Sequence, residues 1–409
     1  MDFETKLDRL AEVAVKVGLG LRAGQEVVMT APLEALPLTR LITRHAYKAG
    51  ASLVTTFYGD DQSTLARFEY GAPESFDTAP AWLFEGMAKA YGDGAARLAI
   101  AGDDPALLAA QDPEKVSRAN RARSKAYLPA LKHIVDFHIN WSILSFASPS
   151  WAKMVFPDVP LETAVAKLWD AIFAASRIDE ADPVAAWNAH NARLRDRKTF
   201  LNERRYSALR FRGPGTDLTV GLADRHEWAG GSEAARNGIV CNPNIPTEEV
   251  FTTPHAQRVE GRVTSTKPLS YQGTLIQGIA VRFEAGRIVE ATARTGETVL
   301  HKVLETDAGA ARLGEVALVP NSSPISRSGI LFYNTLFDEN AASHIALGQA
   351  YNKCITGFET MSEEELVEVG ANRSLIHIDW MIGSGEVDVD GVSASGEAEG
   401  LMRAGEWVI

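Results

Sequence analysis

Apolar residues in the first half of the chain alternate between helical spacing and short continuous runs. Residues 3–20 carry apolar side chains on one broad face, which predicts an amphipathic helix. The runs at 26–30 and 52–57 predict strands, and the segment 37–48 between them predicts a helix. This alternation of strands and helices favours a parallel sheet covered by helices.

The same alternation continues to about residue 200. It predicts strands and helices in turn, with strands at 98–101 and 136–141 and helices at 80–92, 115–132, 161–177 and 183–196. Basic residues then accumulate at 193–198. We therefore expect an N-terminal α/β domain with a largely parallel sheet over residues 1–195.

The second half carries hairpin signals instead. Apolar runs flank a Gly-Pro-Gly turn at 213–215 and an Ala-Gly turn at 285–286, which predicts antiparallel strands. Helical and strand patterns follow, with helices expected at 297–305, 340–355 and 362–369 and strands at 375–379 and 386–388. We expect residues 196–409 to form a mixed α+β catalytic domain, and the whole chain to be an α/β protein of two domains.

Composition excludes several classes of function. With 409 residues and 45% hydrophobic residues, the chain can bury two cores. Its net charge of −12 and the absence of a basic run argue against a nucleic-acid partner. The two cysteines form no disulfide framework, and the acidic, amphipathic N-terminal stretch is typical of neither a signal peptide nor a transmembrane helix. We expect a cytoplasmic protein that does not enter the membrane.

The first segment with candidate functional residues is 336–351. Asp338 or Asn340 is expected to cap a helix that begins there, with Glu339 at its mouth. His344 and Tyr351 are seven residues apart, so two helical turns would place them on one face. The alternative is a buried histidine beside a capping acid.

A second segment, 374–383, reads as a buried strand. His377 and Asp379 would point to the same face, and each could bind one of two metal ions about 3.5–4 Å apart. Burial of these side chains is costly unless they are paired or bind a metal. The alternative is a hydrogen bond between the two side chains.

Two further segments supply carboxylates. Three prolines stiffen residues 240–254, so Glu248 and Glu249 would be presented by a rigid loop, although such a loop can also be a solvated turn. Glu315 leads an apolar run. Together with the histidines, these oxygens suit zinc, manganese or cobalt. His226 opens a sequence like HExxH, but Gly230 replaces the second histidine. The chain also lacks dinucleotide, phosphate-loop and serine-hydrolase motifs.

These segments carry a resemblance to a known family. The blocks NPNIPTEEVFTTP at 242–254, LFYNTLFDENAASHIALGQAY at 331–351 and HIDWMIGS at 377–384 resemble the M29 family of metallo-aminopeptidases, the thermophilic aminopeptidase group. The stretches 141–158 and 210–222 are also similar to family sequence. The resemblance therefore spans nearly the whole chain.

The resemblance implies two divalent metal ions (Zn, Co, Mn or Mg) and a homodimer of two-domain subunits. Glu315 would bridge the two ions, and Tyr351 would lie beside them. The implied metal ligands are Glu249, Glu315, Glu339, His344, His377 and Asp379.

The expected activity is removal of N-terminal residues from peptides with a free N-terminus. A metal-activated hydroxide would attack the peptide carbonyl. Glu248 is the candidate that would accept and return the proton, and Tyr351 would stabilise the oxyanion. Two alternatives remain. One is another metal-dependent amidohydrolase or dipeptidase, and the other is a metal-free protein that binds a small ligand.

Overall fold

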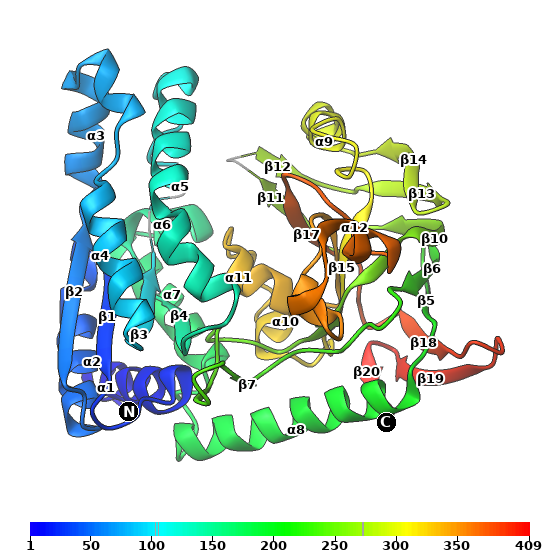
Figure 1. Ribbon diagram of the computed structural model, residues 1–409, viewed down its shortest axis with the longest axis horizontal. Coiled ribbons are helices and arrows are strands. Elements are labelled where there is room, and N and C mark those ends of the chain that lie inside the picture. The colour runs from blue at the N-terminus through cyan, green and yellow to red at the C-terminus, as the bar shows by residue number, and fades with distance from the viewer. Residues whose placement is uncertain (103, 105, 272–273) are drawn as a thin grey trace. The chain divides into compact units, whose positions relative to one another are not determined.

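The computed structural model describes residues 1–102, 104, 106–271 and 274–409. The chain divides into two compact units (Figure 1). Unit 1 comprises Met1–His190 and Ser232–Pro246, and unit 2 comprises Asn191–Gly231 and Thr247–Ile409. Helix α8 (Pro183–Arg204) runs from the first into the second.

The expected single boundary after residue 195 does not describe this division. The segment Ser232–Pro246 returns to unit 1 although it follows the first part of unit 2 in sequence. It does so because its backbone pairs with unit 1: the Ile143 N–H donates to the Pro243 carbonyl at 2.7 Å, and the Ile245 N–H donates to the Ile143 carbonyl at 2.9 Å.

Unit 1 is built on a parallel sheet with strand order β2-β1-β3-β4 (Figure 1). The expected parallel α/β arrangement is confirmed. Its strands are β1 (Glu26–Pro32), β2 (Leu53–Gly59), β3 (Ala96–Ala101) and β4 (Trp141–Ser145), with the short pair β7 (Glu233–Ala234) and β8 (Val240–Cys241) in the returning segment. The prediction of a strand at 136–141 was wrong, because the chain turns at Phe137 (φ 53°) and β4 begins only at Trp141.

Helices alternate with the strands of unit 1 as expected. They are α1 (Phe3–Val13), the π-helical η1 (Ala14–Leu19), η2 (Leu33–Ala35), α2 (Leu36–Lys48), α3 (Asp61–Tyr70), η3 (Pro73–Asp77), α4 (Ala81–Gly92), α5 (Pro113–Val135), α6 (Pro149–Val155) and α7 (Leu161–Ala175), of which α3, α6, η2 and η3 are additional to the predicted ones. Local chemistry sets their ends. Asp2 caps α1 by accepting a hydrogen bond from Thr5 N, and Gly20 closes η1 in the left-handed conformation.

Most strands in the described part of unit 2 belong to one of two antiparallel sheets. The larger has the order β14-β13-β10-β6-β5-β18-β19-β20 and the smaller has the order β17-β16-β15-β9. Strands of the larger sheet are β5 (Ala208–Gly213), β6 (Thr216–Leu222), β10 (Pro254–Thr264), β13 (Ala280–Glu284), β14 (Arg287–Thr292), β18 (Asp388–Val392), β19 (Ala398–Arg403) and β20 (Glu406–Trp407). Strands of the smaller sheet are β9 (Val250–Thr252), β15 (Leu313–Leu318), β16 (His344–Gly348) and β17 (His377–Met381).

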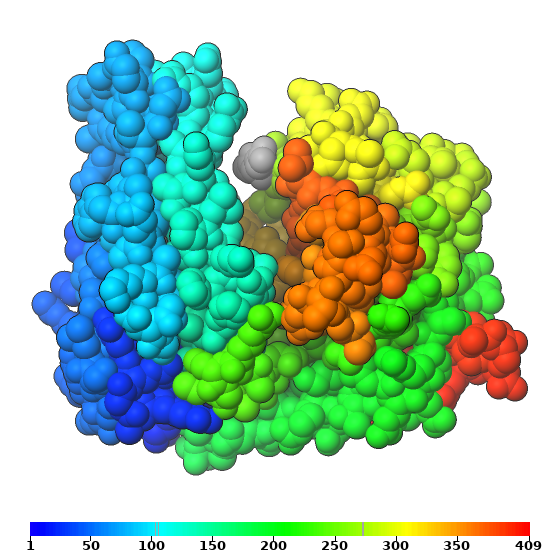
Figure 2. Space-filling view, viewed as in Figure 1, coloured from blue at the N-terminus to red at the C-terminus, as the bar shows by residue number. Residues whose placement is uncertain are grey.

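Short helices and one small hairpin complete unit 2. These elements are β11 (Leu269–Tyr271), β12 (Thr274–Ile276), α9 (Glu297–Leu304), α10 (Pro324–Ser328), α11 (Thr335–Asp338), η4 (Glu339–Ala341), η5 (Asn352–Cys354), η6 (Phe358–Thr360) and α12 (Glu363–Glu368). Residues 350–370, which include η5, η6 and α12, reach the visible surface of this unit (orange in Figure 2).

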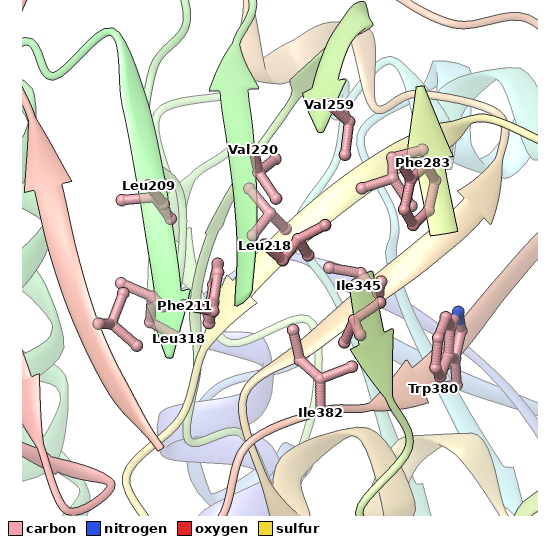
Figure 3. Close-up of a cluster of buried hydrophobic side chains, with 14 of the residues drawn as sticks. Leu209, Phe211, Leu218, Val220, Val259, Phe283, Leu318, Ile345, Trp380 and Ile382 are labelled. Atoms are coloured by element: carbon pink, nitrogen blue, oxygen red, sulfur yellow. The ribbon is translucent and has the colours of Figure 1, made fainter. Parts of the chain in front are cut away.

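The core of unit 2 lies between the two sheets (Figure 3). Phe211 and Val220 point inward from the larger sheet, and Ile345 and Trp380 point inward from the smaller one. Burying each such side chain contributes roughly 1.5–3 kcal/mol. One face of the smaller sheet therefore packs against the larger sheet.

The prediction of a helix over 340–355 was wrong. This segment forms the 3-10 turn η4 and then strand β16, which pairs with β15 on one side and β17 on the other. Asp338 and Asn340 therefore cap no helix there. Within the described residues, no helix is both long enough and apolar enough to cross a membrane.

Candidate metal centre

Strand alternation sorts the side chains of the smaller sheet between its two faces. Ile345 in β16 and Trp380 in β17 belong to the core. Side chains one residue away in a strand point to the opposite face. His344 therefore projects from the other face of β16, and His377 and Asp379 project from the other face of β17.

Glu315 reaches this same face because β15 contains an irregularity. Leu313 and Val316 both belong to the core although they are three residues apart. The register with β16 shifts between Leu313 and Glu315, as in a β-bulge, so Glu315 is turned toward the histidines. Gly314 is required at the shift, because a Cβ there would collide with the carbonyl oxygen of Gln349.

The remaining carboxylate comes from the proline-framed loop. Glu249 directly precedes Val250, the first residue of β9 and a member of the core. A small residue leaves room between the strands: Ala346 pairs with Glu315 on one side and Asp379 on the other. The side chains of Glu315 and Asp379 can therefore approach each other above Ala346.

Five of the predicted ligands meet in two groups that share Glu315. The first is Glu249, Glu315 and His344, and the second is Glu315, His377 and Asp379, with ligand atoms within 4.8 Å of one another in each group. Two contacts to His344 Nε2 measure 3.2 Å from Glu249 and 3.5 Å from Glu315. The His377 Nε2 atom lies 3.4 Å from both Glu315 and Asp379. The two Glu315 oxygens thus face different histidines.

The backbone fixes how both imidazoles are oriented. His344 Nδ1 lies 3.2 Å from the Ala342 carbonyl, and His377 Nδ1 lies 2.7 Å from the Gln349 carbonyl. A carbonyl accepts, so each Nδ1 donates a hydrogen bond and each Nε2 is the ring nitrogen that faces the carboxylates. This arrangement is typical of histidines that bind a metal through Nε2.

Charge interactions in the cluster are strong in the absence of a cation. Burial raises the pKa of Glu315, but the two imidazoles outweigh it and lower that pKa to about 2. Burial lowers the pKa of His377, but Asp379 and Glu315 raise it to about 11. The pKa of His344 is also raised, by Glu249 and Glu315 against the effect of burial.

Glu339 lies beside these two groups and belongs to neither. It follows α11 in η4, an element that contacts β17. Burial, and then the charges of Glu249 and Asp379, raise the pKa of Glu339 well above its usual value. Its carboxylate is therefore close enough to the cluster to repel the other carboxylates.

Tyr351 covers His377. Its ring centroid lies 4.6 Å from that of the imidazole, although the ring reaches this place from the loop after β16 and not from a helix. Desolvation of the phenol and the charges of Glu315, Asp379 and the neighbouring glutamates raise its pKa well above the usual value. With 43% of its surface exposed, Tyr351 also borders solvent.

Glu248 belongs to neither ligand group. Its main-chain N–H donates to the Asn340 side chain at 2.7 Å, and its charge acts on Arg197 of α8. Asn340 is a residue of the centre that sequence reasoning treated only as a helix cap. The HExxH-like His226 lies elsewhere, with its Nδ1 bonded to the Ala223 carbonyl.

The residues present fit divalent metal ions. Glu249 Oε2 and His377 Nε2 are buried and make no hydrogen bond within the described residues. Buried charges and lone pairs of this kind are costly without a cation. A donor set of carboxylate oxygens and imidazole nitrogens suits zinc, cobalt or manganese.

Comparison with known proteins agrees with this chemistry. Residues 3–407 match the family described as thermophilic metalloprotease (M29). The chain is 54% identical over 407 residues to aminopeptidase T of Thermus thermophilus, covering 100% of this chain and 99% of that protein. It is 44% identical over 405 residues to aminopeptidase 2 of Geobacillus stearothermophilus, covering 99% and 98%.

A solved structure shows the same fold. Wild-type AmpT from Thermus thermophilus matches with a TM-score of 0.94 at 53% identity, and the match covers 100% of both chains. The family match spans nearly the whole sequence, and the relatives are similar over their full length. This chain belongs to the thermophilic metalloprotease family M29, a family of peptide-bond hydrolases.

Proposed function

We propose that this protein is an aminopeptidase that removes N-terminal residues from peptides at a two-metal site. The observation that carries the proposal is the pair of ligand groups joined by Glu315, because two groups with one shared carboxylate match the needs of two neighbouring ions. The names of the relatives, aminopeptidase T and aminopeptidase 2, support the exopeptidase activity.

Each ligand group would hold one ion. Glu249 and His344 would bind the first, His377 and Asp379 the second, and Glu315 would bind both. Zinc, cobalt, manganese or magnesium, when bound, would supply Lewis acidity and an activated water for attack on the peptide carbonyl. Glu339 is our candidate for a further ligand, since its carboxylate interacts with those of Glu249 and Asp379.

The two-metal site favours a free N-terminus. Two divalent ions would balance the charge of the four carboxylates of Glu249, Glu315, Glu339 and Asp379. The free α-amine of a peptide would bind one of these ions through its nitrogen lone pair. An acetylated N-terminus has no basic nitrogen and would be a poor substrate.

Two side chains are proposed to act on the substrate directly. Tyr351 would donate a hydrogen bond to the oxyanion that develops on the carbonyl, because its high pKa keeps the hydroxyl protonated. Glu248 is our candidate for the proton acceptor and donor, since it directly precedes Glu249. The charge of its side chain also interacts with that of Arg197 in α8.

We also propose that the enzyme is a cytoplasmic homodimer. Support comes from the family resemblance and from the two cysteines, Cys241 and Cys354, which are buried and not joined in a disulfide. Sedimentation velocity tests the dimer. A monomer at micromolar concentration would contradict it.

The deciding experiment is hydrolysis of Leu- and Arg-p-nitroanilide by metal-free protein reloaded with Zn²⁺, Co²⁺, Mn²⁺ or Mg²⁺. N-acetyl-Leu-p-nitroanilide is the control. We expect activity that returns with metal and is absent on the acetylated substrate. Cleavage of acetylated substrates or of dipeptides alone would favour another amidohydrolase or a dipeptidase. Metal uptake without cleavage would overturn the assigned reaction.

A further inference from the structure

One buried amide connects two of the segments that deliver carboxylates to the metal centre, the loop of Glu249 and the turn of Glu339. Asn340 lies in η4 between Glu339 and the strand that begins at His344, and it is 0% exposed. The loop that carries Glu249 is remote in sequence and contains two prolines, Pro243 and Pro246. Asn340 contacts this loop through its side chain.

The side chain of Asn340 makes three hydrogen bonds. Its Oδ1 accepts from the Glu248 N–H at 2.7 Å, and its Nδ2 donates to the Leu336 carbonyl at 3.1 Å and to Glu339 Oε1 at 3.5 Å. Only one orientation of the amide satisfies these partners, because an N–H needs an acceptor and a carbonyl needs a donor. Asn340 therefore holds a defined position.

The segment around Asn340 is anchored on its other side as well. The Asn340 carbonyl accepts a hydrogen bond from Ser323 Oγ at 2.9 Å, and Ser343 Oγ bonds to the backbone of Val319 at the end of β15. Residues 340–343 are thus bonded at one end to Ser323, the N-cap residue of α10, and at the other end to the residue that follows β15. Because Asn340 is fixed by these bonds, the residues beside it in the chain are held in place as well.

Residues next to both ends of this connection are predicted ligands. Glu249 follows the peptide whose N–H Asn340 binds, and Glu339 precedes Asn340 and accepts its Nδ2 hydrogen. We propose that Asn340 is the positioning residue of the metal centre, which holds Glu249 and Glu339 at the spacing that the ions require. This inference rests on the proposed two-metal site and deepens it.

Asparagine suits this role for a chemical reason. An aspartate would lack the donor for Leu336 and would repel Glu339, whereas an alanine would remove the side-chain acceptor of the buried Glu248 N–H. Groups that orient the ligands of a metal typically change its affinity by about 10–100-fold when they are removed. Loss of Asn340 should therefore weaken metal binding without removing any ligand.

The test compares Asn340→Ala with Asn202→Ala. Asn202 in α8 also binds backbone through both ends of its amide, accepting from Trp228 N at 2.8 Å and donating to Trp228 O at 3.3 Å, and neither bond involves a predicted ligand. Metal-free proteins are titrated with Co²⁺ by calorimetry and visible absorption. We expect Asn340→Ala to bind Co²⁺ about 10–100-fold more weakly, with a changed spectrum, and Asn202→Ala to bind like wild type.

Equal Co²⁺ affinity and spectra in the two variants would overturn the positioning role and leave the metal site intact. If wild type itself failed to bind Co²⁺, the proposed function would fall and this inference with it. If Asn340→Ala did not fold, the proposal is tested by the rate of amide hydrogen exchange at Glu248 in the wild-type protein. The Glu248 amide should exchange slowly and slow further when Co²⁺ binds, and exchange at the rate of an open loop in both states would contradict the proposal.

Discussion

The ring of Tyr351 packs on the imidazole of His377, with centroids 4.6 Å apart and planes inclined by 50°. This contact combines two properties in one side chain. The ring limits the freedom of His377, and the hydroxyl lies in the field of the clustered carboxylates. Substitutions can separate the two.

Tyr351→Phe keeps the ring and removes the hydroxyl. We expect kcat for Leu-p-nitroanilide to fall by about 10²–10³-fold, because the loss of one oxyanion donor costs that much. Metal content should stay at the wild-type value. Tyr70→Phe, at a tyrosine that is 83% exposed in unit 1, is the control and should be unchanged. An unaltered kcat for Tyr351→Phe would exclude the oxyanion role.

Glu315→Gln removes the carboxylate that both ligand groups share. We expect both metals to bind more weakly and activity to fall by more than about 100-fold. A fall of up to about 100-fold is typical when a residue that only orients a ligand is lost. Metal content after gel filtration, measured by mass spectrometry, checks this. The exposed Glu305 offers a matched Glu305→Gln control. Loss of only one equivalent with the other unchanged would show that Glu315 does not bridge.

Glu248→Gln tests the proposed proton acceptor. The amide preserves the size of the side chain and the main-chain bond to Asn340. We expect kcat to fall by about 10²–10⁴-fold, the usual contribution of acid–base catalysis, while metal content and KM change little. A variant with lower metal content and normal turnover per bound metal would instead assign Glu248 a structural role.

Metal removal should destabilise unit 2. An ion that binds only the folded state stabilises it by about 2.7 kcal/mol at a concentration 100 times its Kd. Calorimetry with and without EDTA should therefore show a lower Tm for the metal-free protein. The difference should be smaller in Glu315→Gln. Identical transitions for loaded and metal-free wild type would argue against a metal held by the fold.

His226 makes stability depend on pH. Burial lowers its pKa below the usual value, and the hydrogen bond to the Ala223 carbonyl only partly opposes this, while Nε2 has no hydrogen-bond partner in the described residues. The unfolded chain therefore binds the proton more readily. The stabilisation by neutral His226 is complete above its unfolded pKa of about 6.5 and is lost as the pH falls below it.

His226→Asn can keep a donor for Ala223 and removes the titration. Urea unfolding at pH 7.5 and pH 5 should show that wild type loses more free energy of unfolding than the variant. The expected difference is at most about 1.4 kcal/mol for each unit between the folded and unfolded pKa values. Parallel pH dependence of the two proteins would contradict this account.

Local patterns were sufficient for some elements and not for others. Most strands and helices of unit 1, among them β1, β2, β3, α2, α4, α5 and α7, follow from their periodicity, because each has a local pattern of apolar and polar residues. Strand β16 does not. All five of its residues are buried, and the alanine-rich sequence around it has high helix propensity. Pairing with both β15 and β17 overrides that propensity.

The sequence by itself determined the parallel sheet of unit 1, the antiparallel character of unit 2, and the kinds of side chain available for a metal. These depend on residues that are close in the chain. Only the tertiary structure decided that Glu249, Glu315, His344, His377 and Asp379 meet, and that Ser232–Pro246 joins unit 1. Contacts between remote segments depend on strand register, on the irregularity at Glu315 and on the Asn340 amide, and a local hydrophobic pattern carries no information on these.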